Sequence, residues 1–282
     1  MTDYYDIDRL SFSKLFLLNE TPKHFTWFKD AQPSTKEMDF GNVVHTLVLE
    51  ESKFNDRYEI DSRIIIPTPV KKKKLTKKQL SEMTDHDIKE YRKPEYEMLN
   101  LNLRLQYHRE WLEDFDKKII SSEDYQRAVE MKKSLLNDFE TSLILSSATG
   151  YENEYFYEFG NIPMKSKIDI VGEKFLADLK TIKTGIINNN RKLYWTIISR
   201  GYDIQAALYV FASGLNISEY HLLFVEKKPP FATRMVTLNQ SDLSAGWEKF
   251  LILFDKYLKY KNGKLDKNMS YENIKFSELY DA

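Results

Sequence analysis

The stretch MKSKIDIVGEKFLADLKT, from Met164 to Thr181, predicts the centre of the fold. Apolar and charged residues alternate on both sides of Gly172-Glu173. This pattern predicts two antiparallel strands joined by a two-residue turn with glycine first. The expected register places Val171 opposite Lys174, Asp169 opposite Leu176, and Lys167 opposite Asp178.

Successive strand residues point to opposite faces, so the same pattern sorts the side chains of the hairpin. One face is apolar and carries Ile168, Ile170, Phe175, Ala177 and Leu179. The other face is charged and carries Lys167, Asp169, Asp178 and Lys180. Asp169 and Asp178 would be diagonal neighbours about 7–8 Å apart at the backbone, close enough for both carboxylates to reach one divalent cation. The alternative is a strand pair whose charged face contacts only water.

The composition indicates a globular protein with a substantial core. The chain has 282 residues, 42% of them hydrophobic, and no apolar run long enough to span a membrane. The first residues, MTDYYDIDRL, lack the apolar segment of a signal peptide, so we expect a cytoplasmic protein. The absence of cysteine excludes disulfides, thiolate zinc sites and cysteine-bound iron–sulfur clusters. The net charge of −1 means that any contact with nucleic acid must come from local clusters.

Residues 38–51, MDFGNVVHTLVLEE, have valine and leucine at helical spacing and predict a helix with one buried face. Gly41 is unfavourable in a helix, which suggests that another segment approaches closely there. His45 lies one turn after Gly41, on the flank of the buried face. It is either a metal ligand or a buried histidine satisfied by hydrogen bonds.

A basic tract opens a highly charged segment that we interpret as a helical insertion at about residues 67–120. Its lysines are Lys71, Lys72, Lys73 and Lys74. Such a tract is either a solvated loop, a surface that contacts phosphates, or a binding site for an acidic partner.

The second half of the chain alternates strands and helices. Strands are expected at 154–159, 219–226 and 231–238, and helices at 203–211 and 241–261. Gln205 and Tyr209 are four residues apart and therefore share one face of the first of these helices. They either border a functional site or pack the helix on the sheet.

The order helix, insertion, three strands, helix, strand resembles the core of the PD-(D/E)XK nucleases, a mixed central sheet flanked by helices. Four motifs are similar to those of its exonuclease branch: Gly41-x-x-x-His45, Lys167-Ile168-Asp169, Asp178-Leu179-Lys180-Thr181 and Gln205-x-x-x-Tyr209. The segments SFSKLFLLNETPKHF, FGNVVHTLVLE, RGYDIQAALY and FVEKKPPFATRMV resemble the phage-type exodeoxyribonuclease VIII enzymes in particular. The resemblance covers most of the chain and is weakest at residues 67–115.

The resemblance implies roles for these residues. His45, Asp169, Asp178 and the backbone carbonyl of Leu179 would hold Mg²⁺ or Mn²⁺, hard cations that prefer oxygen ligands. Lys180 would orient the attacking water or help to deprotonate it, and could stabilise the negative charge that develops on the phosphate. Gln205, Tyr209 and the lysines of the basic tract would contact the substrate, and Glu154 is a weaker candidate near the metal.

The resemblance also implies a function: a metal-dependent exonuclease that degrades double-stranded DNA from its ends, 5′ to 3′, in phage-type recombination. The whole chain, 1–282, would form one nuclease domain with its catalytic core in 38–51 and 150–260. Such exonucleases often form rings around DNA, and a single-strand annealing protein is the expected partner. The alternatives are an endonuclease on the same core and an inactive DNA-binding or assembly module.

Overall fold

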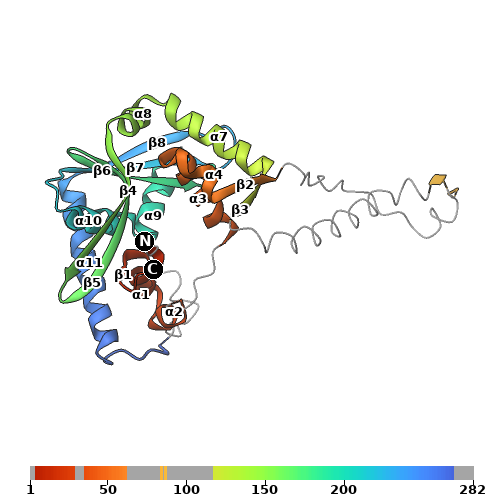
Figure 1. Ribbon diagram of the computed structural model, residues 1–282. Coiled ribbons are helices and arrows are strands. Elements are labelled where there is room, and N and C mark those ends of the chain that lie inside the picture. The colour runs from red at the N-terminus through yellow and green to blue at the C-terminus, as the bar shows by residue number, and fades with distance from the viewer. Residues whose placement is uncertain (1–3, 29–34, 62–82, 85, 88–116, 270–282) are drawn as a thin grey trace. The chain divides into compact units, whose positions relative to one another are not determined.

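The computed structural model describes residues 4–28, 35–61, 83–84, 86–87 and 117–269 (Figure 1). The chain divides into two compact units. The larger consists of Met1–Glu51 with Arg127–Ala282, and the smaller of Ser52–Gln126.

A mixed sheet forms the centre of the larger unit. Among the described residues it has six strands, in the order β1-β5-β6-β7-β8, with β4 paired to β5 outside this path. The pairs β1–β5 and β6–β7 are parallel, and the other neighbours are antiparallel. The bounds are β1 Leu10–Ser11, β4 Ala148–Phe159, β5 Ile162–Gly172, β6 Phe175–Ile182, β7 Glu219–Glu226 and β8 Thr233–Leu238.

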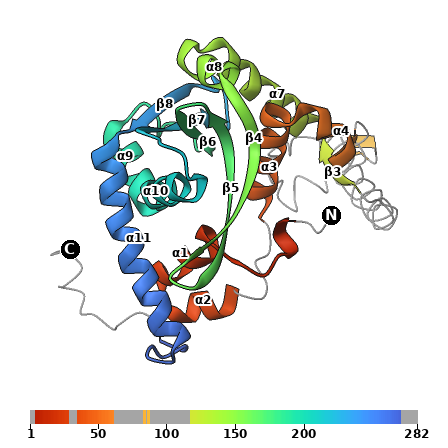
Figure 2. The ribbon, with the colours of Figure 1, turned by 60° about the vertical axis from the view of Figure 1, so that its left-hand side comes forward.

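Helices cover both sides of this sheet, which confirms the expected α/β class. Figure 2 shows α9, α10 and α11 on one side and α3 on the other. The bounds are α1 Phe12–Glu20, α2 Pro22–Phe28, α3 Lys36–Leu49, α7 Ser122–Asn137, α8 Phe139–Ser146, α9 Asn190–Ser199, α10 Tyr202–Ser213 and α11 Gln240–Lys261. Short 3-10 helices occupy Tyr4–Asp6 and Glu51–Lys53.

Polar side chains fix where the helices begin. The hydroxyl of Ser11 accepts a hydrogen bond from the N–H of Lys14 and caps α1. Thr35 caps α3 in the same way, so the helix that carries His45 begins at a defined residue. Gly41 in α3 faces β6, where an added Cβ would lie 3.6 Å from the Thr181 hydroxyl oxygen. The close approach predicted from this glycine is thus that of α3 to the sheet.

The predicted hairpin is present, but its predicted register is wrong by two residues. The paired positions are Ile170 with Ala177 and Val171 with Leu176, so the turn lies at Glu173-Lys174. Gly172 instead makes room for an aromatic ring, because a Cβ on it would lie 2.1 Å from the ring of Phe175. A shift of two residues equals the side-chain period of a strand, so the sorting of side chains between faces is unchanged.

The described part of the smaller unit is a helix and a strand pair. It contains α4 Phe54–Arg57, β2 Tyr58–Asp61 and β3 Lys118–Ser121, and the two strands pair in parallel. The ring of Phe54 packs 5.2 Å from that of Tyr58 and 5.5 Å from that of Tyr125, measured between centroids. Most of the expected helical insertion at 67–120 lies outside the described residues.

In the described part of the chain, every helix is too short or too polar to cross a lipid bilayer.

The contact between Gly172 and Phe175 yields a stability prediction. Gly172→Ala forces a methyl group against the ring, so we expect the free energy of unfolding to fall by roughly 1–3 kcal/mol in urea denaturation. The cost should shrink in a Phe175→Leu background. Gly41→Ala is the matched control, because its nearest neighbour stands at ordinary contact distance and alanine favours a helix. Equal effects of the two glycine substitutions would contradict the role assigned to Gly172.

Candidate functional site

Two carboxylates lie where β5 and β6 stop pairing. The ladder between these strands ends at Ile170 and Ala177, and the next residue on each strand is an aspartate, Asp169 and Asp178. Asp169 Oδ2 accepts a hydrogen bond of 2.9 Å from the N–H of Leu179, so a side chain takes the place of a backbone acceptor. Asp169 is 8% exposed and Asp178 only 1%, so the charged face of the hairpin is covered rather than solvated.

Glu152 on β4 adds a third carboxylate. The neighbouring pairs Tyr151–Ile170 and Asn153–Ile168 place Glu152 opposite Asp169 across the β4–β5 ladder. Its backbone φ is 53°, in the left-handed region, which costs a residue other than glycine on the order of 1 kcal/mol. Lys167 on β5 holds the side chain, with its Nζ 2.9 Å from Oε2. A strained backbone and an ion pair thus direct this carboxylate toward the site.

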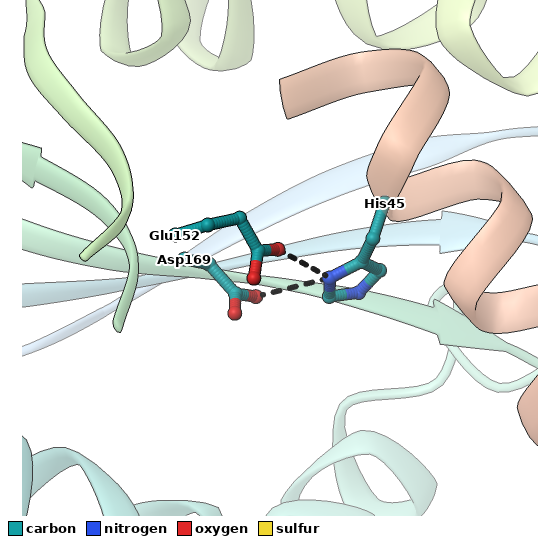
Figure 3. A group of neighbouring side chains, drawn as sticks. All are labelled: His45, Glu152 and Asp169. Atoms are coloured by element: carbon teal, nitrogen blue, oxygen red, sulfur yellow. Dashed lines mark ion pairs between the residues drawn. The ribbon is translucent and has the colours of Figure 1, made fainter. Parts of the chain in front are cut away.

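His45 on α3 faces the carboxylates of Glu152 and Asp169 (Figure 3). Its Nδ1 lies 3.7 Å from Glu152 Oε1 and 3.5 Å from Asp169 Oδ2. One ligand atom from each of these three residues lies within 4.8 Å of the others, which is suitable for a shared metal ion. The three side chains come from α3 and from the consecutive strands β4 and β5, which lie much later in the sequence.

The close approach of these groups shifts their pKa values. The pKa of Asp169 is raised to about 7, first by burial and then by the carboxylate of Asp178. Burial disfavours the charged form of His45, but Asp169 and Glu152 outweigh it and raise its pKa to about 9. Burial also opposes ionisation of Glu152, yet His45 and Lys167 lower its pKa to about 2. The site therefore holds protons that a divalent cation would displace.

Lys180 connects the acidic pair to α10. Its ammonium forms an ion pair with Asp178 Oδ2 and donates a hydrogen bond of 3.1 Å to Gln205 Oε1. Gln205 Nε2 in turn donates to Tyr209 Oη at 2.9 Å. The ammonium also lies 4.7 Å from the centroid of the Tyr202 ring. Burial disfavours the charged lysine, but Asp178 raises its pKa, so the side chain stays protonated at neutral pH.

The structure brings most of the predicted site residues into one neighbourhood. His45 and Asp169 face each other, Asp178 pairs with Lys180, and Gln205 and Tyr209 extend the hydrogen-bond chain. The N–H of Leu179 binds Asp169, while its carbonyl, the predicted ligand, stays a prediction. Glu154 is exposed, and the carboxylate that reaches His45 comes from Glu152 instead. The predicted phosphate contacts, Lys71, Lys72, Lys73 and Lys74, lie outside the described residues.

Sequence reasoning missed Glu152. A signal was present, because Glu152 and Glu154 share a face in a regular strand and the opposite strand carries Asp169. The predicted strand began at Glu154, whereas β4 begins at Ala148 and includes both glutamates. The left-handed backbone at Glu152 interrupts the alternation of exposed and covered side chains along β4. Nothing about glutamate as a residue type indicates such a backbone.

The side chains at the site fit a hard divalent cation. Carboxylate oxygens are the preferred ligands of Mg²⁺ and Mn²⁺, and an imidazole nitrogen suits transition metals better than Mg²⁺. Three carboxylates and one histidine converge here, and Lys167 and Lys180 each form an ion pair with one of the carboxylates. A divalent cation among His45, Glu152, Asp169 and Asp178 would relieve the repulsion that raises the pKa of Asp169.

The mixed sheet, the acidic pair on β5 and β6 and the lysine two residues after Asp178 define a PD-(D/E)XK-type fold, as the sequence predicted. The chain belongs to the family described as a PDDEXK-like domain of unknown function (DUF3799), which matches residues 11–275.

A solved structure shows the same fold over nearly the whole chain. A proposed exonuclease from Eubacterium rectale is similar, with a TM-score of 0.60 and 13% sequence identity over 99% of this chain and 97% of that one. A phage-related exonuclease from Haemophilus somnus 129PT matches with a TM-score of 0.33 and 15% identity, over 48% of this chain and 73% of that one. No curated protein matches the chain.

The raised pKa values predict how the metal-free protein responds to pH. Asp169 and His45 bind a proton more tightly in the folded state than in the unfolded state, so each proton stabilises the fold at low pH. The contribution of Asp169 is lost as pH rises from 3.8 toward about 7, and that of His45 between 6.5 and about 9. We therefore expect the free energy of unfolding to fall across this range.

Asp169→Asn isolates the effect, because it removes one titrating group and weakens the shift of His45. Between pH 5 and 9, urea denaturation in EDTA should show a loss of stability on the order of 2 kcal/mol larger in the wild type than in this variant. Added Mn²⁺ should stabilise the wild type more strongly as pH rises, because the cation competes with the protons. Parallel stability curves for the two proteins would contradict the assigned charges.

Proposed function

We propose that this protein is a nuclease that uses a divalent metal ion to hydrolyse phosphodiester bonds of DNA. One observation carries the proposal: the cluster of His45, Glu152, Asp169, Asp178 and Lys180, drawn from four separate elements, in which both aspartates are buried. A purely structural ion-pair network does not require three carboxylates side by side, since burial of like charges is unfavourable. It does not require a left-handed glutamate either.

His45, Glu152, Asp169 and Asp178 would hold Mg²⁺ or Mn²⁺. When bound, the cation would supply Lewis acidity toward the phosphate and would make water more acidic. Asp169 is fixed by the Leu179 N–H and Glu152 by Lys167, so both carboxylates are oriented before any cation binds. The imidazole of His45 makes Mn²⁺ an effective alternative to Mg²⁺.

Lys180 acts on the phosphate rather than on the metal. Its pKa is raised by Asp178, so at neutral pH it is a cation and a hydrogen-bond donor, not a general base. Gln205 holds the ammonium, and Tyr209 holds Gln205, which limits the motion of the lysine side chain. A fixed ammonium beside the carboxylates stabilises the negative charge that develops on the phosphate and orients the attacking water.

The finer proposal is an exonuclease that degrades double-stranded DNA from its ends, 5′ to 3′, in phage-type recombination. It is supported by the sequence motifs and by the similar fold of the Eubacterium rectale protein, itself a proposed exonuclease. A ring-shaped homo-oligomer, a single-strand annealing partner and phosphate contacts by Lys71, Lys72, Lys73 and Lys74 belong to the same proposal. A strict monomer in light scattering at working concentration would remove the ring.

The deciding experiment compares linear blunt-ended DNA with closed circular DNA, each with Mg²⁺, Mn²⁺ or EDTA. We expect loss of the linear substrate only, no reaction in EDTA, and at least about a 100-fold lower rate for Asp178→Asn. Cutting of the circle would favour an endonuclease on the same core. A folded protein that binds DNA but cleaves neither substrate would favour an inactive binding module.

Two glutamates on β4 provide a matched pair for the metal site. Glu152→Gln removes a carboxylate that faces His45, so we expect Mn²⁺ affinity, measured by calorimetry, to fall about 10- to 100-fold, with a loss of cleavage. Glu154→Gln changes an exposed residue two positions away and should leave both unchanged. Similar losses in the two variants would mean that β4 does not hold the metal through Glu152.

A further inference from the structure

The segment after the acidic strand is basic and contains no acid. Residues 179–202 read LKTIKTGIINNNRKLYWTIISRGY, with five lysines and arginines and no aspartate or glutamate. The whole chain has 42 basic and 43 acidic residues, so this segment departs from the average composition. It contains the end of β6, a loop and α9.

α9 buries one face and exposes two large aromatic rings on the other. Leu193 and Ile197 belong to the hydrophobic core between α9, α10 and the sheet. Tyr194 is 57% exposed and Trp195 is 55% exposed, and their ring centroids lie 5.5 Å apart in an edge-to-face arrangement. Arg191 is exposed and lies one helical turn before Trp195 on the same face. Two adjacent aromatic rings left in water are unfavourable for folding, which suggests that they bind another molecule.

A second set of cations lies at the carboxyl ends of β6 and β7. The register pairs Ile182 with Glu226, so Lys183 and Lys227 leave the two parallel strands side by side. Lys227 donates from Nζ to the carbonyl of Glu37, in the first turn of α3. Burial lowers its pKa, the carboxylate of Glu37 acts in the opposite direction, and the positive charges of Arg200 and Arg127 lower it further. Three cations therefore lie near one carboxylate, and a bound anion would balance the remaining positive charge.

These two sets of side chains continue from the candidate active site. Lys183 lies just beyond the end of β6, which carries Lys180, about 10 Å further along the chain at the usual rise per strand residue. At the other end, Arg200 caps α9 and is separated by one glycine from Tyr202, whose ring contacts the Lys180 ammonium. A polymer held at the metal site could therefore extend toward these cations and rings.

We propose that this surface binds an unpaired nucleic-acid strand, whose phosphates contact the cations and whose bases stack on the two exposed rings. The surface, called the α9 surface below, consists of Lys183, Arg191, Tyr194, Trp195, Arg200 and Lys227. The proposal extends the proposed nuclease function, because it names the part of the substrate that lies beyond the scissile bond. It predicts a preference for ends that carry unpaired nucleotides.

The combination of charge and exposed rings favours a nucleic-acid strand over other partners. Cations alone would suit an acidic peptide, but base stacking also requires open aromatic faces next to those cations, as α9 presents. A second copy of this chain docked through the same surface would bring cations against cations. A paired duplex keeps its bases stacked inside and offers the rings little contact.

The test measures binding by fluorescence anisotropy with the full chain in EDTA, so that no cleavage occurs. The probes are an oligothymidylate of roughly 20 nucleotides and a blunt hairpin duplex. We expect Trp195→Ala to weaken binding of the single strand about 5- to 100-fold and to affect the duplex little. Trp195→Phe should retain the affinity, because the ring can still stack. Phe139→Ala on α8, which removes a ring that is 79% exposed elsewhere, is the matched control.

Charge is tested through the salt dependence. Arg200→Gln and Lys227→Gln should each lower the slope of log affinity against log salt concentration by about 0.7 for the single strand. Lys259→Gln on α11, an exposed lysine paired with Asp255, should leave the slope unchanged. Unchanged slopes for both α9-surface variants would overturn the assignment of these cations to phosphates.

The outcomes separate this proposal from the proposed nuclease function. Unchanged single-strand affinity in Trp195→Ala overturns the α9 surface, even if metal-dependent cleavage is intact. If Trp195→Ala forms a smaller oligomer than the wild type in light scattering, with DNA binding unchanged, the α9 surface would instead be an interface between copies of the chain. Loss of binding in Trp195→Ala from a protein that never cleaves DNA would support the surface and refute the nuclease.

Discussion

The structure depends on two aspartates buried side by side at the point where β5 and β6 stop pairing. Burial and the carboxylate of Asp178 both oppose the ionisation of Asp169, so the neighbouring elements must supply compensating contacts. The backbone N–H of Leu179 binds Asp169, and the ammonium of Lys180 pairs with Asp178. His45 on α3 adds a positive charge near both. The arrangement of α3 and the central strands is therefore tied to one local balance of charge.

Much of this arrangement could be predicted from the sequence, because strand alternation and helix periodicity report which residues share a face. The alternation around Asp169 and Asp178 identified the acidic face, and the motif order identified the fold. The exact pairing could not be obtained in this way. Glycine is typical of turns, so Gly172 was placed in the turn. Its role is instead to leave space for the ring of Phe175, and only the folded chain brings the two residues together.

Glu152 and the α9 surface were missed for different reasons. The left-handed backbone at Glu152 turns one glutamate inward and leaves Glu154 exposed, and nothing in the two residue types distinguishes them. Aromatic residues are usually buried, and the exposure of Tyr194 and Trp195 depends on which face of α9 meets the core. Both features depend on tertiary contacts that local periodicity does not encode.

The hydrogen bond from Leu179 to Asp169 has a consequence for how such a protein can change over generations. Asp169 is at once a candidate metal ligand and the acceptor for a buried backbone N–H, so its loss would weaken the sheet as well as the chemistry. A lineage that abandons catalysis cannot drift freely at this position. Asp169→Asn keeps an oxygen for the N–H while removing the charge, so descendants that have become pure binding proteins should carry this change more often than alanine or glycine.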